Sequence, residues 1–194
     1  MNKILGLTGG VGMGKSTVAR LLGKAGWPVV DSDDLARDVV RPDQPALEEI
    51  RRIFGDEFIQ TDGRLDRAKM AEHVFKDSSA RECLEGIIHP RVRESWQESI
   101  AGWRKARQGG VVVIPLLFEV GVESNFDAVL CVACTAETQM ARLRERGWGD
   151  TQVRQRMEAQ IGIETKMDRS DHVLWNEGEI EALEVQLRQL GLVD

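Results

Sequence analysis

The sequence lacks the features that direct a chain to a membrane, to an export pathway or to nucleic acid. No apolar run in its 194 residues approaches the ~20 residues that a bilayer-spanning helix needs. Met1-Asn2-Lys3 leads directly into an apolar run, which leaves no room for a signal peptide. The net charge of −6 argues against a surface that coats nucleic acid, because such a surface needs concentrated lysine and arginine. We therefore expect a cytoplasmic monomer or weak homo-oligomer without nucleic-acid or membrane partners.

Cysteine is scarce as well, with three residues in the chain. Cys131 and Cys134 have C-x-x-C spacing, but Cys131 falls within the apolar run Ala128–Ala133 and no second pair exists. We interpret the cysteines as small buried side chains in a reducing compartment, rather than as zinc ligands or a redox pair. At 42% hydrophobic residues, the chain has enough apolar material for one domain with insertions.

A phosphate-binding loop is the most informative feature that is present. Residues 9–16 match G-x-x-x-x-G-K-[ST], after a strand-like run and before a helical pattern. Glycines let successive backbone N–H groups converge on phosphate oxygens, and the following helix directs its positive end at the same anion. Lys15 is expected to reach the β- and γ-phosphates, and the Ser16 hydroxyl to ligate Mg²⁺. The alternative is a glycine-rich turn without function. The residues predicted to hold ATP here are Gly10, Val11, Gly12, Met13, Gly14, Lys15, Ser16 and Thr17.

Short apolar runs separated by helical patterns predict an α/β fold, in which a parallel sheet carries helices on its faces. The last helix is the clearest, because Ile180, Leu183, Leu187 and Leu190 form one stripe that Gly191 ends. The runs predicted as strands are Lys3–Thr8, Trp27–Val30, Gly110–Ile114, Asp127–Ala133 and His172–Trp175.

Two helical insertions are expected in this core. About eighty residues separate Val30 from Gly110, too many for a simple crossover. One helix within them is predicted to open with Pro90 in its first turn. The second insertion is rich in arginine, which favours a lid facing an anion over a solvated face with pairs such as Glu158 with Arg154. The predicted regions are a nucleotide-binding core (1–30, 108–134 and 170–194), an acceptor-binding region (31–107) and a lid (135–169).

Three acids follow the second predicted strand. Ligands of open α/β sheets bind beyond the carboxyl ends of the strands, so Asp31 and Asp33 are expected to emerge toward the phosphate loop. A carboxylate there can accept the proton of an acceptor hydroxyl, and we favour Asp33 for that role. The alternative is that Ser32 or Asp33 only caps the following helix.

The third predicted strand runs into proline and an apolar segment, instead of the aspartate that commonly holds magnesium in P-loop ATPases. Leu117 and Glu119 in this segment either line the acceptor pocket or, for the apolar part, belong to the core. Farther along, Arg142 and Arg146 sit four residues apart on one helical face. Paired guanidinium groups suit a triphosphate and the charge that moves during phosphoryl transfer.

Taken in order, several segments resemble dephospho-coenzyme A kinase, and the likeness runs essentially from end to end. Met13 departs from the Ser or Ala that the family commonly has there, but this loop position contributes its backbone. The matching stretches are residues 6–17, Asp31-Ser32-Asp33 with Ala36-Arg37, residues 63–67, Ile88-His89-Pro90-Arg91, residues 115–119, Gln139-x-x-Arg142-Leu143-x-x-Arg146, Arg156-x-x-x-Gln160, Asp171-His172-Val173 and Asn176-x-Gly178.

The resemblance implies a five-stranded parallel core, a helical acceptor domain and a mobile lid. It implies that ATP, with Mg²⁺, phosphorylates the ribose 3′-hydroxyl of dephospho-coenzyme A. By the same resemblance Asp33 is the base, and Arg67 and the segment from His89 to Arg91 face the acceptor. Arg142 would clamp the nucleotide and Asn176 would lie near the adenine. His89 also has two other interpretations, a helix cap or a core histidine.

Other functional classes remain as alternatives. Another small-molecule P-loop kinase, acting on a nucleoside monophosphate or a small alcohol, would share the loop, the lid and the base. A regulatory GTPase would carry an Asn-Lys-x-Asp guanine reader or an aspartate at the end of a hydrophobic strand, and neither is present. A binding module without catalysis leaves the arginine-rich lid without a purpose. The sequence therefore favours a small-molecule kinase.

Overall fold

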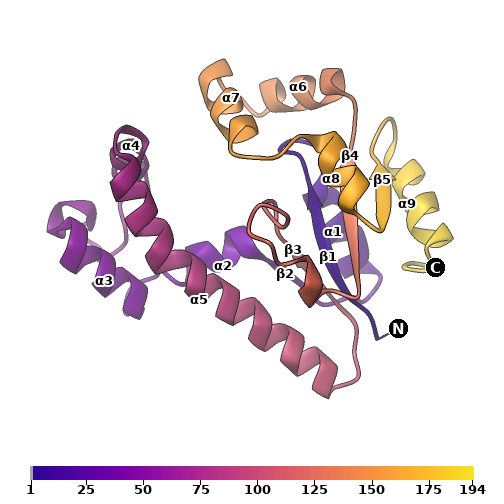
Figure 1. The fold of residues 1–194 in the computed structure, drawn as a ribbon, viewed down its shortest axis with the longest axis horizontal. Coiled ribbons are helices and arrows are strands. Elements are labelled where there is room, and N and C mark those ends of the chain that lie inside the picture. Colours follow the sequence, from indigo (N-terminus) through magenta and orange to yellow (C-terminus); the bar gives the residue numbers. More distant parts are fainter. Residues whose placement is uncertain (1) are drawn as a thin grey trace. The chain divides into compact units, whose positions relative to one another are not determined.

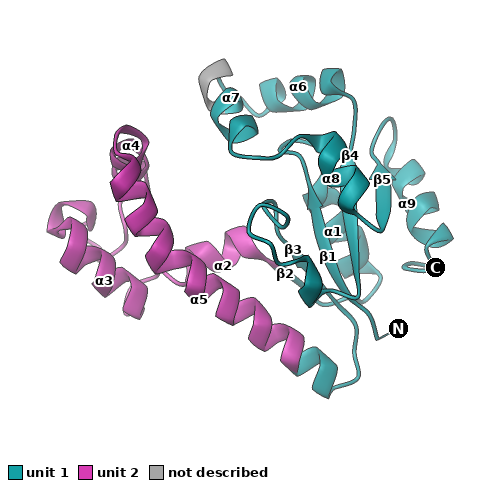
Figure 2. Cartoon of the chain, viewed as in Figure 1, with its two compact units in different colours: residues 1–30, 102–194 teal, residues 31–101 magenta. Residues whose placement is uncertain are grey.

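The computed structural model describes residues 2–194, except for the side chains of residues 150–152. The chain forms two compact units (Figure 2). Unit 1 contains residues 1–30 and 102–194, and unit 2 contains residues 31–101. Within the part of the chain that is described, no helix is both long and apolar enough to cross a bilayer.

A five-stranded sheet forms the centre of unit 1 (Figure 1). The strand order is β2-β3-β1-β4-β5, and the β1–β3, β1–β4 and β4–β5 pairs are parallel. Every residue of β1, β3 and β4 is buried, as expected of strands covered on both faces. The predicted α/β fold is confirmed. The strands are β1 Ile4–Gly9, β2 Val29–Asp31, β3 Gly110–Val113, β4 Ala128–Ala133 and β5 His172–Trp175.

Helices of unit 1 pack against the sheet and form the rest of the core of this unit. The apolar stripes of α1 (Lys15–Lys24) and α9 (Ile180–Gln189) pack with strand residues such as Leu7 and Leu130. The predicted stripe of the last helix is confirmed, since Leu183 and Leu187 are buried in it. Three more helices follow β4, namely α6 Ala136–Glu145, α7 Asp150–Glu158 and α8 Ile163–Arg169. Helix α8 contacts both β1 and β4.

Unit 2 is helical and has its own core. Leu47, Ile50, Phe58, Met70 and Ile87 are buried together there. Its helices are α2 Ser32–Asp38, α3 Pro45–Phe54, the 3₁₀ turn η1 Asp56–Phe58, α4 Arg67–Lys76 and α5 Ser78–Lys105, whose last turn belongs to unit 1. Ile59 and Leu65 form an isolated antiparallel bridge between η1 and α4.

Pro90 does not open a helix, and that prediction was wrong. It lies inside the 28-residue helix α5, where its ring removes one backbone hydrogen bond. Two contributions offset this loss. Ile87, Val92 and other side chains on both sides of the proline are buried along the helix. The Arg91 guanidinium also donates to the Ile87 carbonyl at 2.6 Å, in the turn that the proline disturbs.

Candidate active site

The phosphate-binding loop joins β1 to α1 and depends on glycine at two close approaches. Gly14 caps α1 with φ of 103°, and a Cβ there would lie 2.0 Å from the Asn176 amide nitrogen. Gly12, with φ of 76°, would place a Cβ 2.9 Å from the Leu143 side chain of α6. Both dihedrals fall in the region that only glycine adopts without strain. The loop therefore has its shape fixed by the segments that pack against it.

Lys15 is the first residue of α1, and its side chain folds back over the loop. Its Nζ donates to the carbonyl oxygens of Gly9 at 2.9 Å and Gly10 at 3.0 Å. The ammonium group therefore stands over the loop backbone, where an anion at the start of α1 would meet both the charge and the helix N-terminus.

Three amide side chains hold the loop from outside. The Asn176 side chain, which is buried, donates to the Met13 carbonyl at 2.8 Å. The Gln139 side chain donates to the Val11 backbone carbonyl at 2.7 Å, and the Val11 N–H donates to the side-chain oxygen Oε1 of Gln160 at 3.1 Å. From the sequence, no role was assigned to Gln139 or Gln160, although both lie in segments that match the family. The structure thus places Asn176 against the loop backbone, with its amide group engaged there.

Arg142 projects from α6 and is half-buried. Its Nη1 is buried and makes no hydrogen bond to any described part of the chain. A buried donor without a partner is costly, and an anionic ligand would remove that cost. The guanidinium lies close enough to Cys134 to oppose the rise in the pKa of this thiol that burial causes. Arg146, in contrast, lies just beyond the end of α6 and is exposed.

The segment after β3 is held by a buried ion pair. Lys166 of α8 is fully buried and donates to the Pro115 carbonyl at 2.6 Å, and its Nζ lies 2.9 Å from Glu119 Oε1. The same carboxylate oxygen accepts the Ile161 N–H at 2.9 Å. Leu117 was expected either to line the acceptor pocket or to belong to the core. It is fully buried, so it belongs to the core. Glu119 links the segment after β3 to α8, and its Oε2 is buried without a hydrogen bond in the described structure.

In unit 2, the two predicted acidic residues have different environments. Asp31 caps α2, because its Oδ1 accepts the Asp33 N–H at 2.8 Å. The capping residue is therefore neither Ser32 nor Asp33. The Asp33 side chain is exposed, and its carboxylate takes part in no hydrogen bond or ion pair among the residues described.

The remaining predicted acceptor residues also lie in unit 2. Arg67 starts α4 and donates to the Arg37 carbonyl at 3.1 Å. His89 is exposed in the middle of α5, which excludes both its alternatives, a helix cap and a core histidine. Arg91 is half-buried and pairs with Glu49 of α3 at 2.7 Å, so its guanidinium joins two helices of the unit.

The residues present fit a magnesium ion only together with a nucleotide. The described residues contain no group of three or more His, Cys, Asp or Glu side chains placed to hold a metal. Ser16 is exposed in the first turn of α1, and the hydrogen bonds of the described structure leave its hydroxyl unengaged. Magnesium keeps several waters and binds through few protein ligands plus substrate phosphates, which this arrangement permits.

Comparison with known proteins shows which family the chain belongs to. The family model described as dephospho-CoA kinase matches residues 3–182. A dephospho-CoA kinase of Anaeromyxobacter dehalogenans is 45% identical over 93% of this chain and 87% of its own length. A solved structure from Thermus thermophilus has 38% identity and a TM-score of 0.82, over 97% of this chain and 95% of that one. A dephospho-CoA kinase structure from Campylobacter jejuni, 22% identical with a TM-score of 0.73, shows the same fold over 98% of both chains. The chain belongs to the dephospho-CoA kinase family.

Proposed function

We propose that this chain transfers the γ-phosphoryl group of ATP to the ribose 3′-hydroxyl of dephospho-coenzyme A, the last step of coenzyme A synthesis. Membership of the family supports ATP and dephospho-coenzyme A as the substrates. The observation that carries the proposal is the loop between β1 and α1, with Lys15 folded over it at the helix N-terminus. Such a loop binds the phosphates of a nucleotide.

Two positively charged side chains of unit 1 are proposed to stabilise the negative charge that moves during phosphoryl transfer. Lys15 leaves the carbonyls of Gly9 and Gly10 and binds the β- and γ-phosphates. Arg142, whose buried Nη1 makes no hydrogen bond among the described residues, donates to an oxygen of the transferred phosphoryl group. Phosphoryl transfer depends mainly on position and charge stabilisation, so these two groups supply most of the catalysis from unit 1.

Magnesium, if bound together with the nucleotide, would neutralise part of the phosphate charge. Ser16 is the side chain proposed to hold it, through a hydroxyl that forms no hydrogen bond within the described part of the chain. Arg146 is proposed to meet the nucleotide from the exposed end of α6. Asn176 is proposed to keep the loop in shape while the adenine binds near it.

Asp33 is the proposed catalytic base. Asp31 already serves as the cap of α2, so the exposed carboxylate of Asp33 is free for another role. The 3′-hydroxyl loses its proton to this carboxylate as its oxygen forms a bond to the γ-phosphorus. The bond between that phosphorus and the oxygen that bridges the β- and γ-phosphates breaks, and ADP leaves.

The helical regions are proposed to divide the remaining tasks. Unit 2, residues 31–101, corresponds to most of the acceptor-binding region expected at 31–107. Within the lid expected at 135–169, α6 and α7 are proposed to close over the nucleotide. Helix α8 is proposed to stay in place, because it packs on β1 and β4 and carries the buried Lys166.

The test is to incubate the purified protein with Mg-ATP and a panel of acceptors: dephospho-coenzyme A, a nucleoside monophosphate and shikimate. Mass spectrometry and ³¹P NMR then identify the product. The expected product is the 3′-phosphate of dephospho-coenzyme A, with Lys15→Ala as the inactive control. Phosphorylation of another acceptor in preference to dephospho-coenzyme A would reject the proposal.

A further inference from the structure

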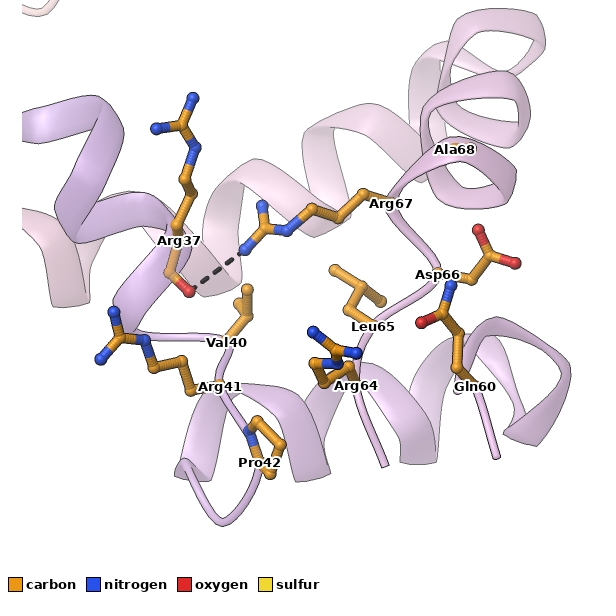
Figure 3. Close-up of a pocket in the computed structure, with 10 residues that line it drawn as sticks. All are labelled: Arg37, Val40, Arg41, Pro42, Gln60, Arg64, Leu65, Asp66, Arg67 and Ala68. Atoms are coloured by element: carbon orange, nitrogen blue, oxygen red, sulfur yellow. Dashed lines mark hydrogen bonds between the residues drawn. The ribbon is translucent and has the colours of Figure 1, made fainter. Parts of the chain in front are cut away.

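The described structure gathers polar side chains at two further places. In unit 2, arginines from three segments line a pocket of about 340 Å³, which lies within the acceptor-binding region already proposed (Figure 3). These arginines are Arg37, Arg41, Arg64 and Arg67. In unit 1, the amide side chains of Gln139 and Gln160 reach the phosphate-binding loop from two segments distant in the chain. The two amides of unit 1 meet at one residue of the loop, Val11.

Val11 lies in a turn that does not satisfy its backbone. The Met13 N–H closes the turn by donating to the Gly10 carbonyl at 3.2 Å, and Val11 and Gly12 are its two central residues. The N–H and the carbonyl of Val11 take no part in the hydrogen bond that closes the turn. Glycines on both sides of Val11 allow the backbone many conformations, so partners outside the turn are needed to fix it.

Gln139 supplies the partner for the Val11 carbonyl. Its side chain is 4% exposed and donates to this carbonyl at 2.7 Å. Arg142 follows three residues later, so the two side chains lie on one face of α6. The neighbouring Leu143 side chain is buried, and a Cβ at Gly12 would lie 2.9 Å from it. The bond from Gln139 therefore sets where α6 holds Arg142 relative to the loop.

Gln160 supplies the partner for the Val11 N–H from the other end of the lid, since its Oε1 accepts this N–H at 3.1 Å. Gln160 lies between α7 and α8, and the N–H of the next residue, Ile161, donates to Glu119 Oε1 at 2.9 Å. Glu119 is in turn paired with the fully buried Lys166. Gln160 therefore ties the loop to a segment that a buried ion pair anchors.

We infer that Gln139 and Gln160 are positioning residues, which hold Val11 in a clamp between the two ends of the lid. The inference rests on the proposed function, in which ATP binds at this loop. Gln139 fixes the loop relative to Arg142, and Gln160 fixes the N–H side of the same turn. The loop and the guanidinium of α6 thereby reach the phosphates in one arrangement. Because both bonds act on one residue, the loss of either one already frees the turn.

The test measures binding of Mg-ADP by isothermal titration calorimetry, and steady-state kinetics, for Gln139→Met, Gln160→Met and the double variant. Methionine keeps the length of the side chain and removes the amide. Each single variant is expected to raise Kd for Mg-ADP and KM for ATP about fivefold to hundredfold, because a backbone group loses its partner. Gln139→Met also lowers kcat about tenfold, since Arg142 is no longer held against the loop. KM for dephospho-coenzyme A stays within about twofold of wild type.

The double variant distinguishes a clamp from two independent contacts. For a clamp, its Kd for Mg-ADP is close to that of the weaker-binding single variant, whereas independent contacts multiply their effects. Gln189→Met, at the exposed end of α9, is the control and keeps Kd within about twofold of wild type. Thermal unfolding monitors the fold. Gln160 is only half-buried, so its variant decides the test if the buried position of Gln139 does not tolerate methionine.

Three results overturn the inference. Unchanged Kd for Mg-ADP and KM for ATP in the single variants mean that the amides do not shape the loop. Effects that multiply in the double variant mean that the two amides act separately. Equal rises in KM for ATP and for dephospho-coenzyme A mean that the substitution only disturbed the protein. If the wild-type protein binds Mg-ADP but leaves dephospho-coenzyme A unphosphorylated, the proposed function fails, and the Kd values for Mg-ADP still decide whether the clamp exists.

Discussion

Lys166 Nζ lies 2.9 Å from Glu119 Oε1, and the lysine is completely buried. Removing one partner of a buried pair leaves the other charge uncompensated, which costs about 3–5 kcal/mol. We expect Lys166→Met to lower the free energy of unfolding by about that amount. Urea denaturation at pH 7 measures it.

The double variant Lys166→Met/Glu119→Gln is the matched control for this pair. It leaves no unpaired charge and keeps an acceptor for the Ile161 N–H, so it is expected to be more stable than Lys166→Met alone. Additive losses from the two substitutions would show that the ion pair does not couple them.

Lys15→Ala is expected to abolish turnover while the protein stays folded. The substitution removes the ammonium group that stands over the loop, and with it a cation for the transferred phosphate. The product assay gives the rate, and thermal unfolding monitors the fold. Lys24→Ala, at the exposed end of the same helix, is the matched control and should keep wild-type activity. Turnover by Lys15→Ala at the control's rate would remove Lys15 from the mechanism.

Much of the fold followed from the sequence because its signals are local. The apolar runs became the five strands, and the stripe of the last helix became α9. The loop from Gly9 to Ser16 carries its own glycines at the positions of unusual φ. Such features depend on neighbouring residues in the chain, so periodicity and motif spacing reveal them.

Other features depend on residues distant in the chain and could not be predicted. The fully buried Lys166 reads as a surface residue until Glu119 and the Pro115 carbonyl are seen beside it. Pro90 is an ordinary helix start in sequence, and tertiary burial along α5 overrides that local preference. The grouping of arginines around one pocket of unit 2 likewise arises from three separate segments.

The buried thiol of Cys131 makes stability depend on alkaline pH. Burial raises the pKa of this thiol from its ordinary value of 9.0 to about 11, against smaller opposing effects of Lys166, Ser170 and Lys15. The unfolded chain therefore loses the thiol proton first as pH rises. The contribution of the protonated thiol to the free energy of unfolding is fully present below pH 9. It is lost progressively toward pH 11, by about 2–3 kcal/mol.

Cys131→Ala isolates this effect, because all other titrating groups are kept. Between pH 8.5 and 10.5, the free energy of unfolding of wild type is expected to fall more steeply than that of the variant. Urea denaturation at each pH measures both curves. Parallel curves would mean that the thiol titrates in the folded protein as it does in the unfolded chain.

Asp33→Asn separates the proposed base from its acidic neighbours. The amide is close in size to the carboxylate but cannot accept the hydroxyl proton, so kcat is expected to fall by about 10²–10⁴-fold with little change in KM for ATP. Asp34→Asn is the matched control, since Asp34 is an exposed acid in the same turn that pairs with Arg37. The control should keep kcat within about threefold of wild type. A loss in Asp33→Asn as small as that of the control would assign the proton to another group, because removal of a positioned base always slows the chemical step itself.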